Sequence, residues 1–219
     1  MAAAFAEPFQ IYKFEASTVL NLSWHPQGDY LAVGGHQGVK IWDIRQSSKP
    51  MLLEVPGASL CSQWSPNGTF LASGNLDRTI SVLNHKQPPP WLMQGFPGKV
   101  SHLAWMQSKR RCFAAAASDG ITIWTQKTDK EWRSRVLTGH HSLIRAIDYQ
   151  PNGDLLASAD KEQQIKIWSD GQKLQQTLSG PLAGTHCLRW SQSGEMLAIG
   201  GMDGAVIIFF IENATKGFG

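Results

Sequence analysis

The stretch Gly139–Asp170 reads GHHSLIRAIDYQPNGDLLASADKEQQIKIWSD. It contains two runs of alternating apolar and polar residues, joined by Pro151, Asn152 and Gly153, and a third run that ends at Trp168. Alternating runs separated by short Pro, Gly and Asn turns are typical of antiparallel strands. The stretch therefore predicts a three-stranded meander.

The same pattern recurs along the chain with a fixed period. An aromatic residue ends the first strand of each unit, at Trp24, Trp64, Trp105, Tyr149 and Trp190. A large residue ends the third strand of each unit, at Trp42, Leu83, Trp124, Trp168 and Phe209. Both series repeat about every 41 residues, and a propeller blade takes roughly 40–45 residues and four strands. The two series therefore predict a β-propeller.

On these residues the chain resembles the WD-repeat β-propeller family, from about Ile11 to Asn213. The Trp-Asp pair of the family stands at Trp42 and Asp43, and its Gly-His pair stands at Gly139 and His140. In that family a His, a Ser or Thr, an acidic turn residue and the strand Trp form a buried hydrogen-bonded set. The resemblance implies that this set consists of His140, Ser158, Glu162 and Trp168.

We expect an all-β chain with an N-terminal tail at 1–9, a propeller over 10–213 and a C-terminal tail at 214–219. The propeller is predicted to have five four-stranded antiparallel WD40-type blades, with Gln10–Glu15 as an outermost strand. In a closed ring that strand would complete the last blade beside Val206–Ile211, which would leave no open sheet edge. The large residues that end the first and third strands suit the blade-to-blade spacing of propellers with more blades. They favour an incomplete, open propeller, resembling the C-terminal five repeats of a longer bacterial WD-repeat protein, over a closed five-blade ring.

Composition narrows the class of protein and its partners. The net charge of +3 and pI near 8.8 do not favour nucleic acid as a partner, and the basic run Lys109–Arg111 is interpreted as a solvated loop. Three cysteines cannot all pair, and Cys61 and Cys187 share one register that predicts small buried groups. We therefore expect a reducing, cytoplasmic compartment. No apolar run is long enough to predict a membrane span.

Seven of the nine tryptophans take landmark positions and are predicted to lie in the cores between blades. Trp91 follows three prolines and is expected either to pack on its outer strand or to stand exposed as an anchor for a partner. Trp132 falls in the polar insertion 126–133, which is interpreted as a surface loop.

The loops that lead into the first strands and those between second and third strands share one rim in the family, and partners usually bind there. The resemblance places a candidate partner-binding rim at His36, Leu76, Arg78, Phe96, Lys99, His141, Lys161 and Met202. Exposed apolar residues among Arg and Lys fit interface composition. Phe96 precedes Pro97 and Gly98, so it is alternatively a staple of its own loop.

Three functional hypotheses follow. The first is a non-enzymatic scaffold, without a cofactor, that binds a protein or peptide on the rim, while missing N-terminal blades or another copy of the chain complete the ring. The second, motivated by Asp77, Asp119 and Asp203 in equivalent turns, is a propeller enzyme or metal-binding protein with a site near the central channel. The third is nucleic-acid binding through Lys109–Arg111, which salt would weaken strongly. The sequence contains no P-loop, nucleophile elbow or His-Glu-x-x-His motif, and therefore favours the first hypothesis.

Overall fold

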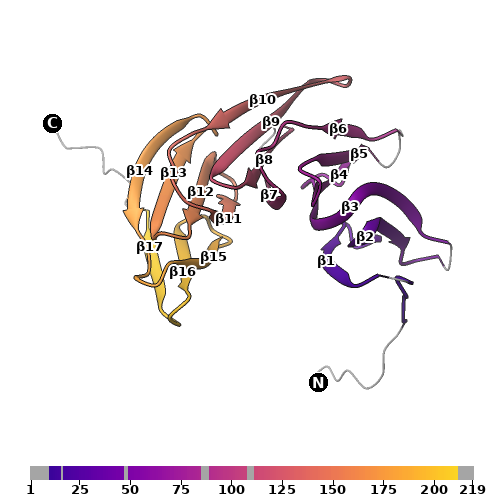
Figure 1. Ribbon diagram of the computed structural model, residues 1–219, viewed down its shortest axis with the longest axis horizontal. Helices are drawn as coiled ribbons and strands as arrows, with labels where there is room; N and C mark the ends of the chain where they lie inside the picture. The colour runs from indigo at the N-terminus through magenta and orange to yellow at the C-terminus, as the bar shows by residue number, and fades with distance from the viewer. Residues whose placement is uncertain (1–9, 16, 47–48, 85–88, 108–110, 212–219) are drawn as a thin grey trace.

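The computed structural model describes residues 10–15, 17–46, 49–84, 89–107 and 111–211. Across these residues it has seventeen β-strands and no helix, so no described segment is a helix that could cross a membrane. The strands form antiparallel sheets that stand side by side along an open arc (Figure 1). The prediction of an all-β chain of antiparallel propeller sheets is therefore confirmed. The predicted tails at 1–9 and 214–219 lie outside the described residues.

The first sheet has six strands that follow one another in chain order. They are β1 (Val19–Trp24), β2 (Tyr30–Asp43), β3 (Met51–Trp64), β4 (Phe70–Asn75), β5 (Ile80–Asn84) and β6 (Trp91–Met93). The first half of β3 pairs with β2, through Met51 and Ile41, and its second half pairs with β4, through Trp64 and Leu71. Strand β3 therefore belongs to two groups of strands and joins them without a loop.

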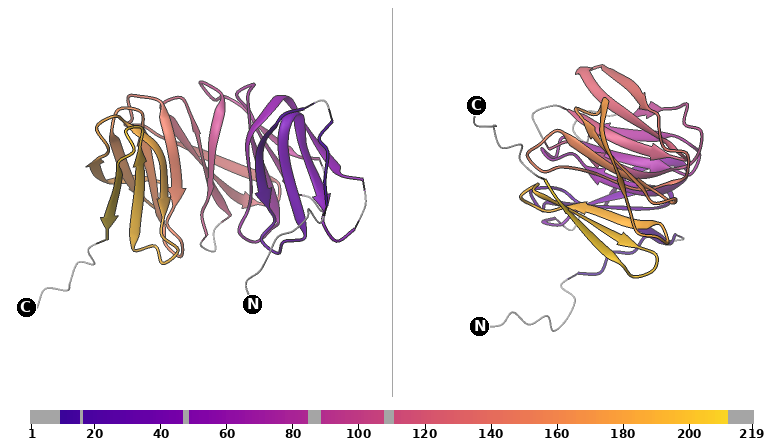
Figure 2. Two further views of the ribbon diagram at one scale, coloured as in Figure 1. Left: turned by 90° about the horizontal axis from the view of Figure 1, so that it is seen from below. Right: turned by 90° about the vertical axis from the view of Figure 1, so that its left-hand side faces the viewer.

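The three remaining sheets have four, four and three strands. They contain β7 (Val100–Trp105), β8 (Cys112–Ala117), β9 (Gly120–Thr128) and β10 (Glu131–Leu137); β11 (Ile144–Tyr149), β12 (Leu155–Asp160), β13 (Gln164–Ser169) and β14 (Lys173–Ser179); and β15 (Thr185–Trp190), β16 (Met196–Gly201) and β17 (Val206–Phe210). The structure thus describes sheets of six, four, four and three strands instead of five separate four-stranded sheets. Figure 2 shows the same sheets from two further sides.

Five strands, which we call the inner strands, line the cavity between the sheets: β1, the second half of β3, β7, β11 and β15. Each inner strand has a shift in pairing register near its start. At each shift one extra residue lies between two paired ones, and the five extra residues are Leu20, Leu60, Ser101, Arg145 and His186. A β-bulge of this kind redirects a side chain away from the regular pleat.

Aromatic landmarks fill the cores between neighbouring groups of strands, as the repeat predicts. Trp64 packs with Val39 and Ile41 of the preceding group, and Trp105 packs with Phe70 of the group before it. Trp190 lies in the corresponding core beside β12 and β13. Trp24 is the exception: no sheet of the described residues packs on the outer side of β1, and 58% of its surface is exposed. The prediction that Trp24 is buried is therefore wrong in this structure.

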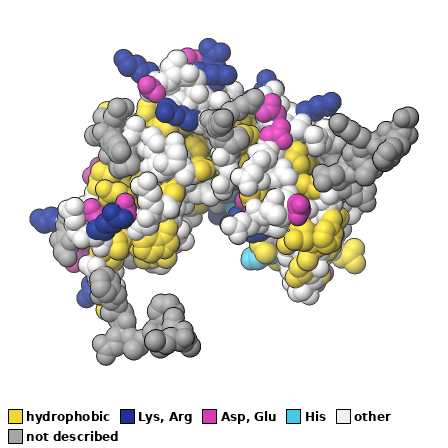
Figure 3. All heavy atoms as spheres, turned by 180° about the vertical axis from the view of Figure 1, so that it is seen from behind, with side chains coloured by type: hydrophobic (Ala, Val, Ile, Leu, Met, Phe, Trp, Pro, Cys, Tyr) yellow, Lys and Arg dark blue, Asp and Glu magenta, His cyan; other side chains and the backbone are white. Residues whose placement is uncertain are grey.

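Both ends of the arc expose apolar side chains. Leu22 and Trp24 are exposed on β1, and Val206, Ile208 and Phe210 are exposed on β17. Strand β17 pairs only with β16, so its other edge has no partner within the described residues. Figure 3 shows hydrophobic side chains gathered at both ends of the molecule. Burying apolar surface is favourable by about 25 cal/mol per Å², so both ends are suited to further contacts.

The segment Gln10–Glu15 is not a strand, which contradicts the prediction. The ring of Tyr12 lies 5.4 Å from that of Trp42, and the ring of Phe14 lies 6.5 Å from it. Tyr12 and Phe14 therefore pack against Trp42 of β2. The segment therefore lies at the β1 end of the arc and does not complete the sheet of β17 (Figure 1).

The insertion around Trp132 is a strand pair and not a surface loop. Strands β9 and β10 extend together, and Trp132 pairs with Gln126. The ring of Trp132 lies 5.5 Å from Phe113 and 6.3 Å from Trp91, and both tryptophans are half-buried. Trp91 therefore packs and does not stand exposed. The interpretation of Trp132 as part of a surface loop is wrong, because its ring packs against other aromatic rings. These contacts stabilise the extension of β9 and β10, although the sequence of the extension is polar.

The shared register of Cys61 and Cys187 does not bury both thiols. Cys61 is half-buried, because its Sγ lies 3.7 Å from the carbonyl oxygen of Val100 on the next inner strand. Cys187 lies on the last of the five described inner strands and is exposed, since no other described inner strand covers it. All three cysteines are free.

Candidate functional site

Backbone hydrogen bonds hold the two kinds of rim loop against each other. In three places an N–H in the turn between a second and a third strand donates to a carbonyl that comes just before the paired part of an inner strand. The pairs are Leu76 to Ala58 at 2.9 Å, Lys161 to Leu143 at 2.9 Å and Met202 to Gly184 at 3.1 Å. These bonds hold Leu76, Lys161 and Met202 at equivalent places on one rim.

Seven of the eight predicted rim residues are exposed. They are His36, Leu76, Arg78, Lys99, His141, Lys161 and Met202. The backbone N–H of His36 donates to Ser17 Oγ at 2.8 Å, which fixes this turn to the loop before β1. The rim therefore presents two exposed apolar side chains, Leu76 and Met202, among basic ones.

Phe96 is the eighth predicted rim residue, and the structure buries it. Only 8% of its surface is exposed, and its ring lies 6.4 Å from that of Trp124. The preceding Gly95 has a φ of +96°, a conformation that glycine adopts without steric cost. Phe96 is therefore a staple between two groups of strands, and its prediction as a partner-binding residue is wrong.

His140, Ser158 and Trp168 form a buried hydrogen-bonded chain. Trp168 Nε1 donates to Ser158 Oγ at 2.8 Å, and Ser158 Oγ lies 2.8 Å from His140 Nε2. His140 Nδ1 lies 2.8 Å from Asp160 Oδ2. Burial lowers the pKa of His140, although the bond to Asp160 opposes this shift. In its neutral form His140 donates from Nδ1 to Asp160 and accepts from Ser158 at Nε2.

The acidic member of this set is Asp160, not Glu162 as predicted. Asp160 is buried, and its Oδ1 accepts the backbone N–H groups of Glu162 and Gln164 at 2.9 and 3.0 Å. The side chain of Glu162 is exposed in the turn. The shorter Asp side chain fits because it lies at the end of β12, two residues beyond Ser158, and faces the same side of the strand.

The acidic turn residues bond within their own turns. Thr79 Oγ1 donates to Asp77 Oδ1 at 2.6 Å, and the N–H of Ala205 donates to Asp203 Oδ1 at 3.0 Å. Such bonds are the ordinary role of Asp in turns. In the part of the chain that the structure describes, no three His, Cys, Asp or Glu side chains are grouped to hold a metal ion.

Of the predicted basic loop, Lys109 and Arg110 lie outside the described residues. Arg111 Nη1 donates to Gln126 Oε1 at 3.0 Å and pairs with Asp129 at 3.1 Å. Arg111 is thus bonded to the β9–β10 extension.

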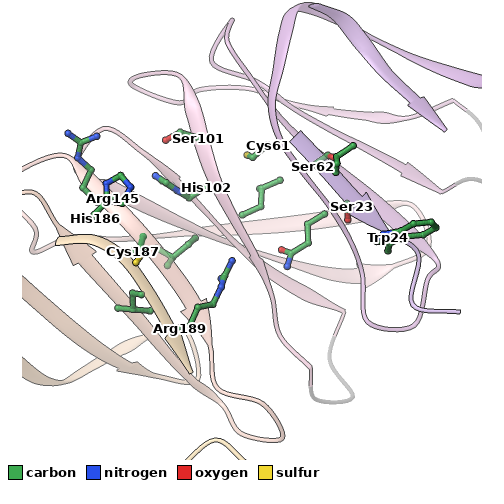
Figure 4. A pocket seen from close by; sticks show the side chains of 16 residues that line it. Ser23, Trp24, Cys61, Ser62, Ser101, His102, Arg145, His186, Cys187 and Arg189 are labelled. Carbon is green, nitrogen blue, oxygen red and sulfur yellow. The ribbon is translucent and has the colours of Figure 1, made fainter. Parts of the chain in front are cut away.

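A cavity of about 550 Å³ lies between the inner strands. Its basic and imidazole side chains are His102, Arg145, His186 and Arg189, and no Asp or Glu lines it (Figure 4). Arg189 pairs with the nearby Asp148 at 3.4 Å. The cavity is therefore basic, which is the opposite of the acidic channel site considered from the sequence.

His102 makes stability depend on pH. Burial, followed by the charges of Arg145 and Arg189, lowers the pKa of His102 to about 4 from the ordinary 6.5. The unfolded chain therefore binds a proton between pH 6.5 and 4 that the folded protein does not bind, so acid lowers the free energy of unfolding in this window. Between pH 7 and pH 4, we expect the free energy of unfolding of His102→Asn to fall less than that of the parent protein, by up to about 3 kcal/mol. Urea unfolding at a series of pH values measures this difference, and parallel pH profiles would contradict it.

Comparison with known proteins places the fold in a family. A family model described as "WD domain, G-beta repeat" matches residues 8–43, 57–84, 132–169 and 172–209. These segments cover more than half of the chain. The chain belongs to the WD40 repeat family. The family model matches four WD40 repeats; the segments 8–43 and 57–84 both lie in the six-stranded sheet, and no matched segment covers β7–β9.

Two similar WD40 proteins come from eukaryotes. The chain is 23% identical to Protein hir1 of Schizosaccharomyces pombe over 242 residues, covering 90% of this chain and 26% of hir1. It is 23% identical to THO complex subunit 3 of Arabidopsis thaliana, covering 71% of this chain and 50% of that protein. The chain thus spans a quarter to a half of the length of these relatives. The expected likeness to a bacterial protein finds no support among them.

A solved structure shares the WD40 fold. A chain in the "Crystal Structure of Mitotic Checkpoint Complex" superposes with a TM-score of 0.71 at 18% identity, covering 92% of this chain and 68% of that chain. At this identity the likeness shows the fold alone.

Sequence reasoning missed the basic cavity. Arg145 and His186 take the same bulge position in their strands, so they fit neither face of a regular strand. Aligning the repeats on Tyr149 and Trp190 would have placed both at one level, four residues before the landmark. That shared offset was the available signal.

Proposed function

We propose that this chain is a non-enzymatic interaction scaffold that binds a protein or peptide segment through its rim. The observation that carries the proposal is the fixed, exposed arrangement of Leu76, Met202, Arg78 and Lys161 on one side of the sheets. Exposed apolar residues beside Arg are enriched where protein interfaces concentrate their binding energy. A preformed rim also loses little conformational freedom on binding.

The similar proteins support this assignment by analogy. Two of them belong by name to assemblies: the THO complex and the mitotic checkpoint complex. Fold alone does not define function, so the rim geometry remains the stronger support.

We also propose that the described strands count as five blades of an open propeller. Five inner strands carry the same register shift, and β3 serves as the outer strand of the first blade and the inner strand of the second. The last blade then lacks an outer strand beside β17. The apolar ends of the arc are covered, in this proposal, by further blades or by a partner chain.

The rim is tested by changing Leu76, Arg78 and Met202 together to alanine. Because all three side chains are exposed, we expect unchanged stability but at least a tenfold loss of specifically recovered proteins in affinity capture followed by quantitative mass spectrometry. The matched control changes Lys127, Arg133 and Val136 to alanine, on the exposed part of β9 and β10. Equal recovery with both triple variants would remove the rim from the proposed function.

A further inference from the structure

The five bulges of the inner strands bring unlike side chains to one level of the cavity. Three bulge residues line it: Ser101 from β7, Arg145 from β11 and His186 from β15. The other two, Leu20 and Leu60, belong to the opposite part of the arc. Because a bulge re-aims its extra residue, polar and basic groups gather on one side of the cavity (Figure 4).

Arg145 has no partner among the described residues. Its Nε is buried and makes no hydrogen bond, and no described carboxylate pairs with its guanidinium. Leaving a buried donor unsatisfied is unfavourable by roughly 1–3 kcal/mol, and more for a charged group. Arg189 differs, since Asp148 lies 3.4 Å away and offsets its charge. Arg145 is therefore a cation that can bind an anion.

The surroundings reinforce the positive potential at this level. His186 is exposed next to Arg145 in the cavity wall, and no acidic side chain lines the wall. The charges of Arg145 and Arg189 both act on His102 and help to lower its pKa to about 4, with burial as the larger cause. His102 is therefore neutral at physiological pH and can contribute a hydrogen bond without charge.

Apolar side chains line other parts of the same cavity. Leu22 is exposed at the cavity, and Leu103 is half-buried there, so a ligand that enters meets both basic and apolar surface. Nucleic acids bind through many phosphate contacts to Lys and Arg, and this cavity offers two arginines and no lysine. Its volume of about 550 Å³ suits a few amino-acid side chains.

We propose that the cavity between the inner strands binds an acidic peptide segment, with a carboxylate held by Arg145 and His186 and an apolar residue elsewhere in the segment against Leu22 and Leu103. Guanidinium and carboxylate form bidentate, charge-assisted hydrogen bonds, which satisfy the buried Nε of Arg145. This site is separate from the rim and goes beyond the proposed function.

The test measures fluorescence anisotropy of a labelled ten-residue peptide rich in Asp and Glu with two leucines. The comparison peptide replaces every Asp and Glu by Asn and Gln. We expect the purified chain to bind the acidic peptide at least tenfold more tightly, with affinity that falls as salt rises. Arg145→Gln is expected to weaken binding at least tenfold. The matched control Arg133→Gln, on the exposed part of β10, is expected to change it less than twofold.

Two further variants distinguish a loss of peptide binding from a loss of folding. Ser101→Glu places a carboxylate in the cavity while Arg145 remains, and is expected to weaken acidic-peptide binding, whereas Arg145→Lys is expected to retain part of it. The triple rim variant is expected to bind the acidic peptide normally, so that failure here and failure of the rim proposal are distinguished. Equal affinity for the two peptides, or normal binding by Arg145→Gln, would overturn the proposal. Tighter, Arg145-dependent binding of a uridine oligonucleotide would also overturn it, in favour of a phosphate ligand.

Discussion

Replacing Trp105 by alanine is expected to lower the free energy of unfolding by about 4 kcal/mol. Only 5% of the Trp105 surface is exposed, and its ring lies 4.8 Å from that of Phe113. Its Nε1 also donates to the carbonyl oxygen of Gln63 at 3.0 Å, which leaves a buried acceptor without its partner in the variant. Urea unfolding followed by circular dichroism measures the change.

Trp24 provides the matched control for this substitution. It holds the same place in β1 that Trp105 holds in β7, but no preceding sheet packs on it. Trp24→Ala is expected to lower the free energy of unfolding by less than about 1 kcal/mol, as an exposed side chain does. A loss as large as that of Trp105→Ala would show that this end of the arc is covered in solution.

Asp160→Ala is expected to lower the free energy of unfolding by about 3 kcal/mol, because it removes the acceptor of three hydrogen bonds in a buried site. His140 Nδ1, the N–H of Glu162 and the N–H of Gln164 all lose their partner. Of these, His140 is itself buried and so cannot turn to water. Chemical unfolding at pH 7 gives the difference.

Glu162→Ala is the control, two residues away in the same turn. Its side chain is exposed, so the expected change is within about 0.5 kcal/mol. If Glu162→Ala were the more damaging of the two substitutions, the assignment of Asp160 to the buried set would be wrong. Asp160→Asn should be milder than alanine, since Asn75 holds the equivalent place on β4 and bonds Ser73, Thr79 and Ser81.

The repeated sheets could be predicted from the sequence because their cores depend on large residues at a fixed period. Trp64, Trp105 and Trp190 take equivalent places, and each packs against the preceding group of strands. The period carries no information about what lies beyond the first sheet. The exposure of Trp24 and the course of Gln10–Glu15 therefore could not be predicted from it.

The buried set and the rim were predicted in part, for two different reasons. His140, Ser158 and Trp168 lie together, but choosing between Asp160 and Glu162 required knowing where β12 ends. Phe96 could be either a staple or an anchor, and only its contact with Trp124 decides. The basic cavity could not be seen at all, because a bulge breaks the two-residue alternation on which strand prediction depends.

Because of strand β3, we expect the two ends of the arc to differ in how easily their strands open. Strand β3 pairs with β2 from Met51 to Ala58 and with β4 from Ser59 to Trp64, so the first two groups of strands share one backbone element. Opening either group disturbs amide protons of the other, and the pair forms one cooperative unit in hydrogen exchange. Within the described residues, the sheet of β15–β17 shares no strand with another sheet, so we expect it to open by itself. We therefore expect the amides of β15–β17 to be less protected from exchange and proteolysis than those of the first sheet.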